Sequence, residues 1–224
     1  MSRQLSFDLP VLPTMGRDDF FVSRSNTAAV AMIEGWQDWP ARKLALIGPK
    51  GAGKTHLVHV WAGLSGGRIV AAETLGAADI PALAETHVAI EDAQDVAGLA
   101  DREEALFHLH NLALAEGRSV LLTASGAPQH WGLRLPDLAS RMEGTPSVRI
   151  SEPDDALLTA ILMKMFADRQ LRPTPETIPY LVPRMPRAFA AAHAIVDMLD
   201  RMALDQGKPI NRRLAAEALD NPAN

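Results

Sequence analysis

The sequence predicts an α/β fold, in which a parallel sheet is flanked by helices and followed by a small C-terminal all-α domain. Short apolar runs alternate with helical patterns up to Ile150, the order expected of a parallel sheet covered on both faces. A glycine-rich turn, Gly48–Thr55, joins the first apolar run to a helical pattern. From Glu152 onward only helical periods remain, which predicts the all-α domain.

The first part of the chain supplies the predicted strands. They are the apolar runs Lys43–Ile47, Arg68–Ala71, His87–Ile90, Ser119–Thr123 and Ser147–Ile150. Predicted helices start near Ser25–Asn26 and at Lys54, and others cover Asp101–Glu116, Pro153–Gln170, Pro175–Val182, Pro186–Met202 and Asn211–Leu219. Asp101 followed by Glu104 resembles a capping box. Residues 1–19 show no sustained period, so we expect a flexible arm at 1–19, an α/β domain at 20–150 and the helical domain at 151–224.

Composition excludes several classes of protein. A chain of 224 residues with 47% hydrophobic and 22% charged residues is ordinary for a globular protein with a sizeable core. A formal net charge of −5 gives no overall attraction to nucleic acid or to an anionic membrane. The absence of cysteine excludes disulfides and thiolate metal sites. Because no apolar run has the length of a membrane span or the form of a signal peptide, we expect a cytoplasmic protein.

The glycine-rich turn has the complete spacing of a Walker A motif: Gly48, Pro49, Lys50, Gly51, Ala52, Gly53, Lys54 and Thr55. Its backbone N–H groups and the following helix N-terminus suit phosphate oxygens. We expect Lys54 to contact the β- and γ-phosphates of ATP or ADP, and the Thr55 hydroxyl to bind Mg²⁺. A chance glycine-rich turn, the alternative interpretation, would not require a strand before it and a helix after it.

A second motif is the apolar run that ends in Glu91 and Asp92. P-loop enzymes place carboxylates here, one toward Mg²⁺ and one toward the attacking water. A solvated strand end is the alternative. Glu91 stands where aspartate is usual, and its longer side chain displaces the carboxylate from a demanding Mg²⁺ sphere. We therefore expect Glu91 to lie near Mg²⁺, nucleotide binding to persist, and hydrolysis to be weak.

These motifs and their order resemble the DnaA-type AAA+ ATPases, and within that family the short DnaA-related regulators of the Hda type. The resemblance runs over nearly the whole chain. The segments that carry it are Phe20–Asn26, Gly53–Leu57 with His56 after the threonine, Glu91–Gln94, Leu122–Ser125, Leu138–Met142 and Met185–Phe189. The resemblance implies an AAA+ P-loop core with a helical lid.

The resemblance also implies roles for single residues. It implies that Phe21, Val22 and Asn26 lie near the adenine, with His56 beside the nucleotide. It makes Ser125 the sensor 1 residue, where the family more often has Asp or Asn, and Arg187 the sensor 2 arginine. It makes Arg141 an arginine finger that acts on the nucleotide of a neighbouring protein. Taken without the family, Arg141 is an ordinary surface cation at a helix end and Arg187 a helix cap.

The N-terminal segment Gln4–Leu9 resembles the peptide by which bacterial replication proteins bind the sliding clamp. Such peptides bind in an extended form, and here Gln4, Leu5, Phe7 and Leu9 would make the contacts. Asp8 interrupts the apolar pair at its end, which leaves the register open.

The function implied is that of an ADP- or ATP-binding regulator of replication initiation, which stimulates ATP hydrolysis by a DnaA-type initiator while bound to the clamp. Basic and acidic residues nearly balance between Ser151 and Asn224, and no basic recognition helix follows the last predicted helix, so we expect no sequence-specific binding to duplex DNA. Two alternatives are a self-sufficient AAA+ ATPase such as a helicase loader, and a non-catalytic adaptor between clamp and initiator. The sequence also leaves open whether the chain forms a homo-oligomer.

Overall fold

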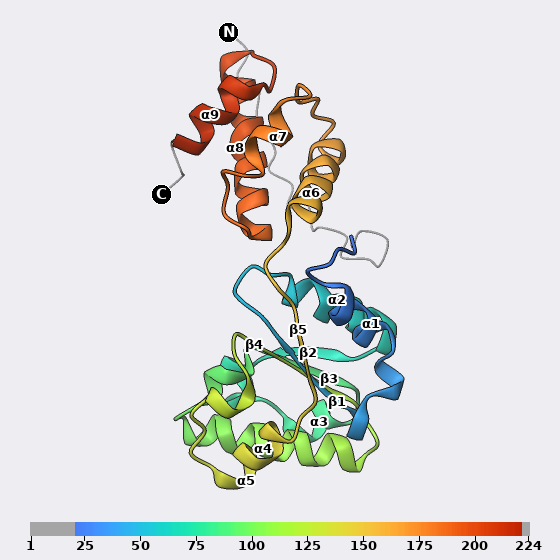
Figure 1. The fold of residues 1–224 in the computed structure, drawn as a ribbon. Helices are drawn as coiled ribbons and strands as arrows, with labels where there is room; N and C mark the ends of the chain where they lie inside the picture. Colours follow the sequence, from blue (N-terminus) through green and yellow to red (C-terminus); the bar gives the residue numbers. More distant parts are fainter. Residues whose placement is uncertain (1–20, 221–224) are drawn as a thin grey trace.

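The structure, a computed structural model, describes residues 21–220. Figure 1 shows a sheet with helices on both faces and, beyond one end of the sheet, a separate group of helices. The strands are β1 (Lys43–Ile47), β2 (Arg68–Ala71), β3 (Val88–Glu91), β4 (Val120–Ala124) and β5 (Ser147–Arg149). The helices are α1 (Thr27–Glu34), α2 (Lys54–Ser65), α3 (Ile80–Ala84), α4 (Ala100–Ala115), α5 (Pro136–Glu143), α6 (Asp155–Asp168), α7 (Thr177–Leu181), α8 (Phe189–Gln206) and α9 (Arg212–Asp220).

The sheet confirms the predicted α/β class. Its strands run in the order β2-β3-β4-β1-β5, and every pair is parallel. Each predicted strand lies within one residue of an observed one. The three central strands, β1, β3 and β4, are continuous apolar runs because they are buried on both faces. In a parallel sheet all carboxyl ends lie at one edge, so the segments that follow β1, β3 and β4 are neighbours there.

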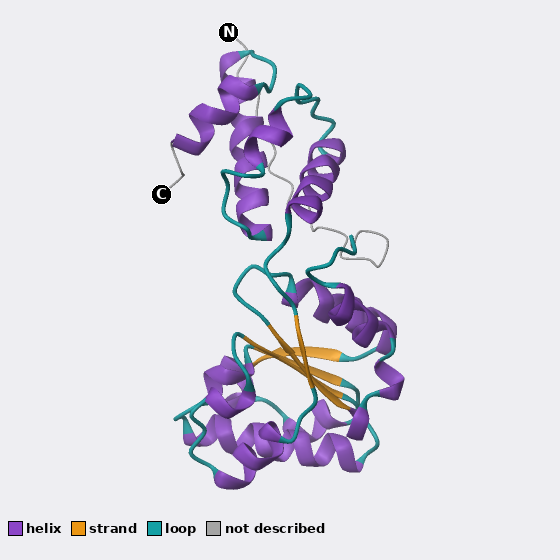
Figure 2. Cartoon of the chain, in the orientation of Figure 1, coloured by secondary structure: helices purple, strands orange, loops and turns teal. Residues whose placement is uncertain are grey.

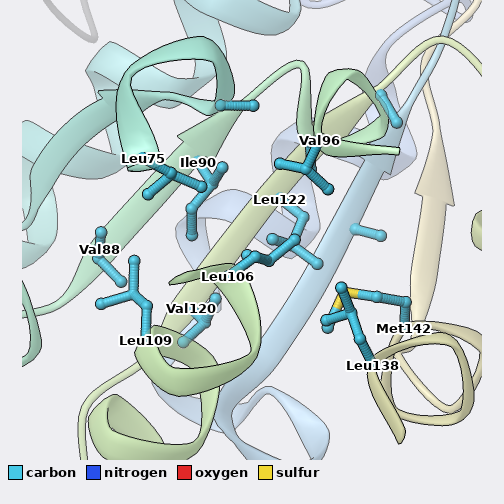
Figure 3. Close-up of a cluster of buried hydrophobic side chains, with 14 of the residues drawn as sticks. Leu75, Val88, Ile90, Val96, Leu106, Leu109, Val120, Leu122, Leu138 and Met142 are labelled. Atoms are coloured by element: carbon cyan, nitrogen blue, oxygen red, sulfur yellow. The ribbon is translucent and has the colours of Figure 1, made fainter. Parts of the chain in front are cut away.

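Alternate side chains of the strands enter two different cores. Leu44 and Leu46 of β1 pack with α1 and α2 on one face. Ala45 and Ile47 point to the other face, which α4 and α5 cover. Figure 3 shows this second core, where Leu106 of α4 and Leu138 and Met142 of α5 meet Val88, Ile90, Val120 and Leu122 of the sheet.

The C-terminal helices have a core of their own. Figure 2 shows a region built of helices and loops alone, with the sheet confined to the rest of the molecule. Its buried residues come from all four helices and include Leu162, Phe166, Leu181, Val196, Leu199 and Leu214. The predicted all-α region is therefore present, connected to β5 by the segment 150–154.

Two features differ from the sequence-based expectations. The predicted capping box at Asp101 is wrong: the residue that caps α4 is Leu99, without a side-chain hydrogen bond, and the carboxylate that binds the nearby backbone is that of Glu103. The short helix α3 has no counterpart among the predicted elements.

The described helices include none that is long and apolar enough to cross a bilayer.

Candidate nucleotide site

The loop between β1 and α2 has the backbone that a phosphate-binding turn needs. Gly51 and Gly53 have φ values of +81° and +98°, in the region that glycine adopts without strain. Among residues 21–220, no carbonyl accepts a hydrogen bond from the N–H groups of Gly53, Lys54 or Thr55. These donors, at the N-terminus of the 12-residue helix α2, form a site of positive potential for an anion.

The Lys54 side chain folds back over this loop. Its Nζ donates to the Gly48 carbonyl at 2.7 Å and to the Pro49 carbonyl at 3.1 Å. Burial lowers the pKa of Lys54, and the negative charges of Asp92 and then Glu91 act in the opposite direction. The structure thus brings the lysine of the loop and the acidic pair at the end of β3 into one electrostatic site.

The ends of β3 and β4 are joined by side-chain hydrogen bonds. Asp92 has a φ of +50°, and its backbone N–H donates to the buried Thr123 hydroxyl at 3.0 Å. Two residues after Asp92, the Gln94 side-chain carbonyl accepts from the Ser125 N–H at 3.3 Å. Thr123 therefore fixes the position of Asp92, and Gln94 fixes that of Ser125. The sequence alone did not predict these two contacts.

The start of α8 packs directly on the glycine loop. The Phe189 N–H donates to the Gly51 carbonyl at 3.1 Å. A Cβ atom placed on Gly51 would lie 2.7 Å from the Cβ of Ala188, and one placed on Gly53 would lie 3.0 Å from the Phe189 ring. The two glycines therefore serve two needs, a positive φ and close approach of the C-terminal helices.

Comparison with solved structures assigns the fold. Domain III of the replication initiation protein DnaA from Thermotoga maritima superposes with a TM-score of 0.79 at 18% sequence identity, covering 96% of this chain and 99% of that one. AMPPCP-bound DnaA from Aquifex aeolicus gives a TM-score of 0.71 at 19% identity, covering 86% of this chain and 67% of that one. This chain has a DnaA-like AAA+ fold.

Other comparisons agree or add nothing specific. The AAA domain of FIGL-1 in complex with ADP matches the AAA+ fold with a TM-score of 0.66 at 14% identity. An uncharacterized protein of Haemophilus influenzae is 24% identical over 218 residues, which is 91% of this chain and 93% of that protein. No protein-family model matches the sequence.

Arg187 lies next to the loop of the AAA+ fold, but its guanidinium is engaged elsewhere. It immediately precedes Ala188 and Phe189, the residues that touch the loop. Its Nη2 pairs with the Asp155 carboxylate at 2.6 Å, and its Nη1 donates to the Pro153 carbonyl at 3.2 Å. In this arrangement Arg187 connects the start of α8 to the start of α6.

The segment before α1 is fixed by one buried side chain. Asn26 is 1% exposed, donates to the Phe21 carbonyl at 2.9 Å and accepts from the Ser23 N–H at 2.8 Å. The Ser25 carbonyl accepts from Ser151 N–H, at the start of the connection to α6. Phe21 and Val22 remain exposed at this junction.

Arg141 lies away from this site, near the end of α5. Its backbone carbonyl accepts from Lys43 Nζ at 3.0 Å. Lys43 is the first residue of β1, whereas the glycine loop follows Ile47, the last residue of that strand. The first and last residues of β1 are about 13 Å apart along the strand. In Figure 1, α5 lies at the end of the sheet that is remote from the C-terminal helices.

The structure describes the remaining predicted residues of the loop but not those of the arm. His56 is half-buried in the first turn of α2, Thr55 is exposed beside it, and Lys50 is exposed on the loop. Gln4, Leu5, Phe7 and Leu9, the predicted clamp-binding residues, lie outside the described residues.

Proposed function

We propose that this protein is an Hda-like regulator of replication initiation, which binds ADP or ATP with Mg²⁺ and stimulates ATP hydrolysis by a DnaA-type initiator. We also propose the division into an arm (1–19), a nucleotide-binding domain (20–150) and a lid (151–224). The nucleotide would lie between the last two, because Ala188 and Phe189 of α8 cover the glycine loop.

The nucleotide part of the proposal rests on the loop and the charges around it. Unused N–H donors of the loop would receive the phosphates, Lys54 would exchange its two carbonyl partners for phosphate oxygens, and Thr55 with Glu91 would face Mg²⁺. Phe21, Val22 and Asn26 would border the adenine. Asp92 and Ser125 would face the attacking water, and Arg187 would turn from Asp155 toward the γ-phosphate. AMPPCP-bound DnaA and ADP-bound FIGL-1 have the same fold, which supports an adenine nucleotide.

One observation carries the regulatory part: the separation of Arg141 from this chain's own glycine loop, together with the exposure of its side chain. An arginine held at the other end of β1 cannot act on the nucleotide of its own chain. A guanidinium presented on the surface suits the nucleotide of a neighbouring protein, where such fingers stabilise the charge of the transition state. The DnaA-like fold supports an initiator of that class as the neighbour.

The proposed mechanism uses this chain as an activator. The arm, through Gln4, Leu5, Phe7 and Leu9, would hold the protein on the sliding clamp. Arg141 would enter the initiator's nucleotide site, and hydrolysis would leave the initiator with ADP. The protein's own turnover would be slow, because Glu91 and Ser125 depart from the usual residues and a single chain has no finger for its own site.

The experiment measures hydrolysis of ATP preloaded on the initiator of the same organism, with and without this protein and with clamp loaded on DNA. We expect stimulation that requires both protein and clamp. Stimulation that persists without clamp would contradict the tethering role. Fast turnover by the isolated protein, with no effect on the initiator, would favour the helicase-loader alternative. Binding to clamp and initiator without any stimulation would favour the passive adaptor.

A further inference from the structure

The guanidinium of Arg141 is held by an aromatic ring rather than by an acid. Its Cζ lies 5.2 Å from the centroid of the Phe107 ring on α4. Arg169 and Arg187, in contrast, pair with carboxylates. Among residues 21–220, no carboxylate lies within salt-bridge distance of Arg141. A ring restrains the guanidinium while leaving its charge and N–H donors available, whereas a carboxylate would neutralise and occupy them.

The backbone that carries Arg141 is fixed at the C-terminal end of α5. Its carbonyl is one of the last carbonyls of the helix and accepts from Lys43 Nζ at 3.0 Å and from the Thr145 hydroxyl at 2.9 Å. Lys43 is buried, and burial lowers its pKa, with the charge of Arg141 as the second cause. The positive charge of a lysine at this end also interacts favourably with the negative pole of the helix dipole.

The N-terminal end of α5 is fixed from α4. The Glu103 carboxylate, 2% exposed, accepts from the N–H groups of Arg134 at 2.9 Å, Leu135 at 2.7 Å and Gly98 at 2.7 Å. Leu135 caps α5. Glu103 and Phe107 are four residues apart on α4, so they share one face of that helix. One helix face therefore holds the start of α5 and supports the arginine near its end.

We propose that Phe107 is the positioning residue for Arg141. Its ring holds the guanidinium at the surface, charged and with free donors, while Glu103 and Lys43 fix the two ends of the helix that carries it. The partner's site then receives an arginine that has already lost most of its rotamer freedom, which reduces the entropy cost of inserting it. This inference rests on the proposed finger role of Arg141.

The first test needs no variant. In the wild-type protein, the side-chain proton resonances of Arg141 should shift upfield, because they lie over the Phe107 ring. Resonances at the positions of a freely solvated arginine would overturn the proposal, whatever role Arg141 has.

The second test compares Phe107→Leu, Phe107→Tyr and Arg141→Ala in single-turnover hydrolysis of initiator-bound ATP with loaded clamp. Phe107→Leu should lower the maximal stimulated rate constant about fivefold, the effect of one exposed cation–π contact. The concentration for half-maximal stimulation should stay within about twofold. Phe107→Tyr, which keeps an aromatic face, should restore the rate, and Phe107→Leu should cause no further loss when added to Arg141→Ala.

The outcomes separate this inference from the proposed function. Full stimulation by Phe107→Leu, with stimulation lost in Arg141→Ala, would overturn the positioning role alone. Failure of Phe107→Tyr to restore the rate would do the same, since it would show a packing effect rather than a ring contact. Undiminished stimulation by Arg141→Ala would overturn the finger role and the positioning role together. Nucleotide affinity and thermal stability of each variant serve as folding controls.

Discussion

The contact between the glycine loop and α8 can be tested by adding one methyl group to Gly51. Gly51→Ala places a Cβ atom on a residue whose φ is +81°, which costs an L-residue about 1–2 kcal/mol. The new Cβ would also lie 2.7 Å from the Cβ of Ala188, and overpacking of this kind costs about 1–3 kcal/mol. We expect the free energy of unfolding of the nucleotide-free protein to fall by about 2–5 kcal/mol.

A second substitution separates the two causes. Ala188 is the N-cap residue of α8, with an extended backbone at φ −146°, where glycine is well tolerated. Ala188→Gly removes the atom that collides, so in the double variant the collision disappears and only the φ cost remains. The coupling energy from the double-mutant cycle, measured by urea unfolding, should be about 1–3 kcal/mol.

A matched control is Gly63→Ala in α2. Gly63 has an ordinary helical conformation, and a Cβ atom added to it would meet nothing within 4 Å, so the same change should stabilise the protein by about 0.5–1 kcal/mol. A coupling energy near zero between Gly51→Ala and Ala188→Gly would refute the packing of α8 on the loop.

Three further predictions concern binding and pH. Lys54→Ala should weaken ADP or ATP binding at least tenfold in calorimetry, about 1.4 kcal/mol, and equal affinities would contradict the assignment of the loop. Replacing Gln4, Leu5 and Phe7 with alanine should abolish clamp binding without changing nucleotide affinity; retained clamp binding would reject the peptide. The pKa of His110 is lowered to about 4, chiefly by burial, so the folded state favours the neutral ring. As the pH falls from 6.5 toward 4, the unfolded state binds a proton at this histidine before the folded state does, so the free energy of unfolding falls by at most about 3 kcal/mol. Wild type should therefore lose more stability than His110→Leu over this interval. Parallel pH profiles of the two proteins would contradict this prediction.

The strands and the loop were predictable from the sequence because each is encoded by neighbouring residues. The apolar composition of a run such as Lys43–Ile47 indicates by itself that the strand is buried. All residues of the loop from Gly48 to Thr55 are consecutive in the sequence, so the motif can be recognised without the fold. The helix expected at Asp101–Glu116 is observed at Ala100–Ala115 for the same reason. The fold class and the AAA+ resemblance could therefore be predicted from local pattern and motif order, and the comparison with solved structures confirmed them.

The supporting contacts were not predictable, because they join residues far apart in the chain. Phe107 meets Arg141, Lys43 reaches the carbonyl of Arg141, and Ala188 meets Gly51, all across tertiary contacts that no local pattern encodes. Glu103 was overlooked for a related reason. A glutamate in the first turn of a helix resembles a solvated or capping residue, and only the fold brings the backbone N–H groups of Gly98, Arg134 and Leu135 to its carboxylate. In the sequence, resemblance to the DnaA-type family was the only indication of a role for Arg141, because its separation from the glycine loop depends on the fold.

The most direct test of the account is single-turnover hydrolysis of labelled ATP preloaded on the initiator, with loaded clamp and either wild-type protein or Arg141→Ala. Fingers supplied in trans are worth about 10³–10⁵ in rate in GTPases, so even a weaker effect here should be clear. We expect Arg141→Ala to fold, bind ADP and bind clamp as wild type does, yet to lose stimulation. Arg141→Lys should rescue poorly, because an ammonium lacks the planar fork of a guanidinium. Undiminished stimulation by Arg141→Ala would contradict the central claim.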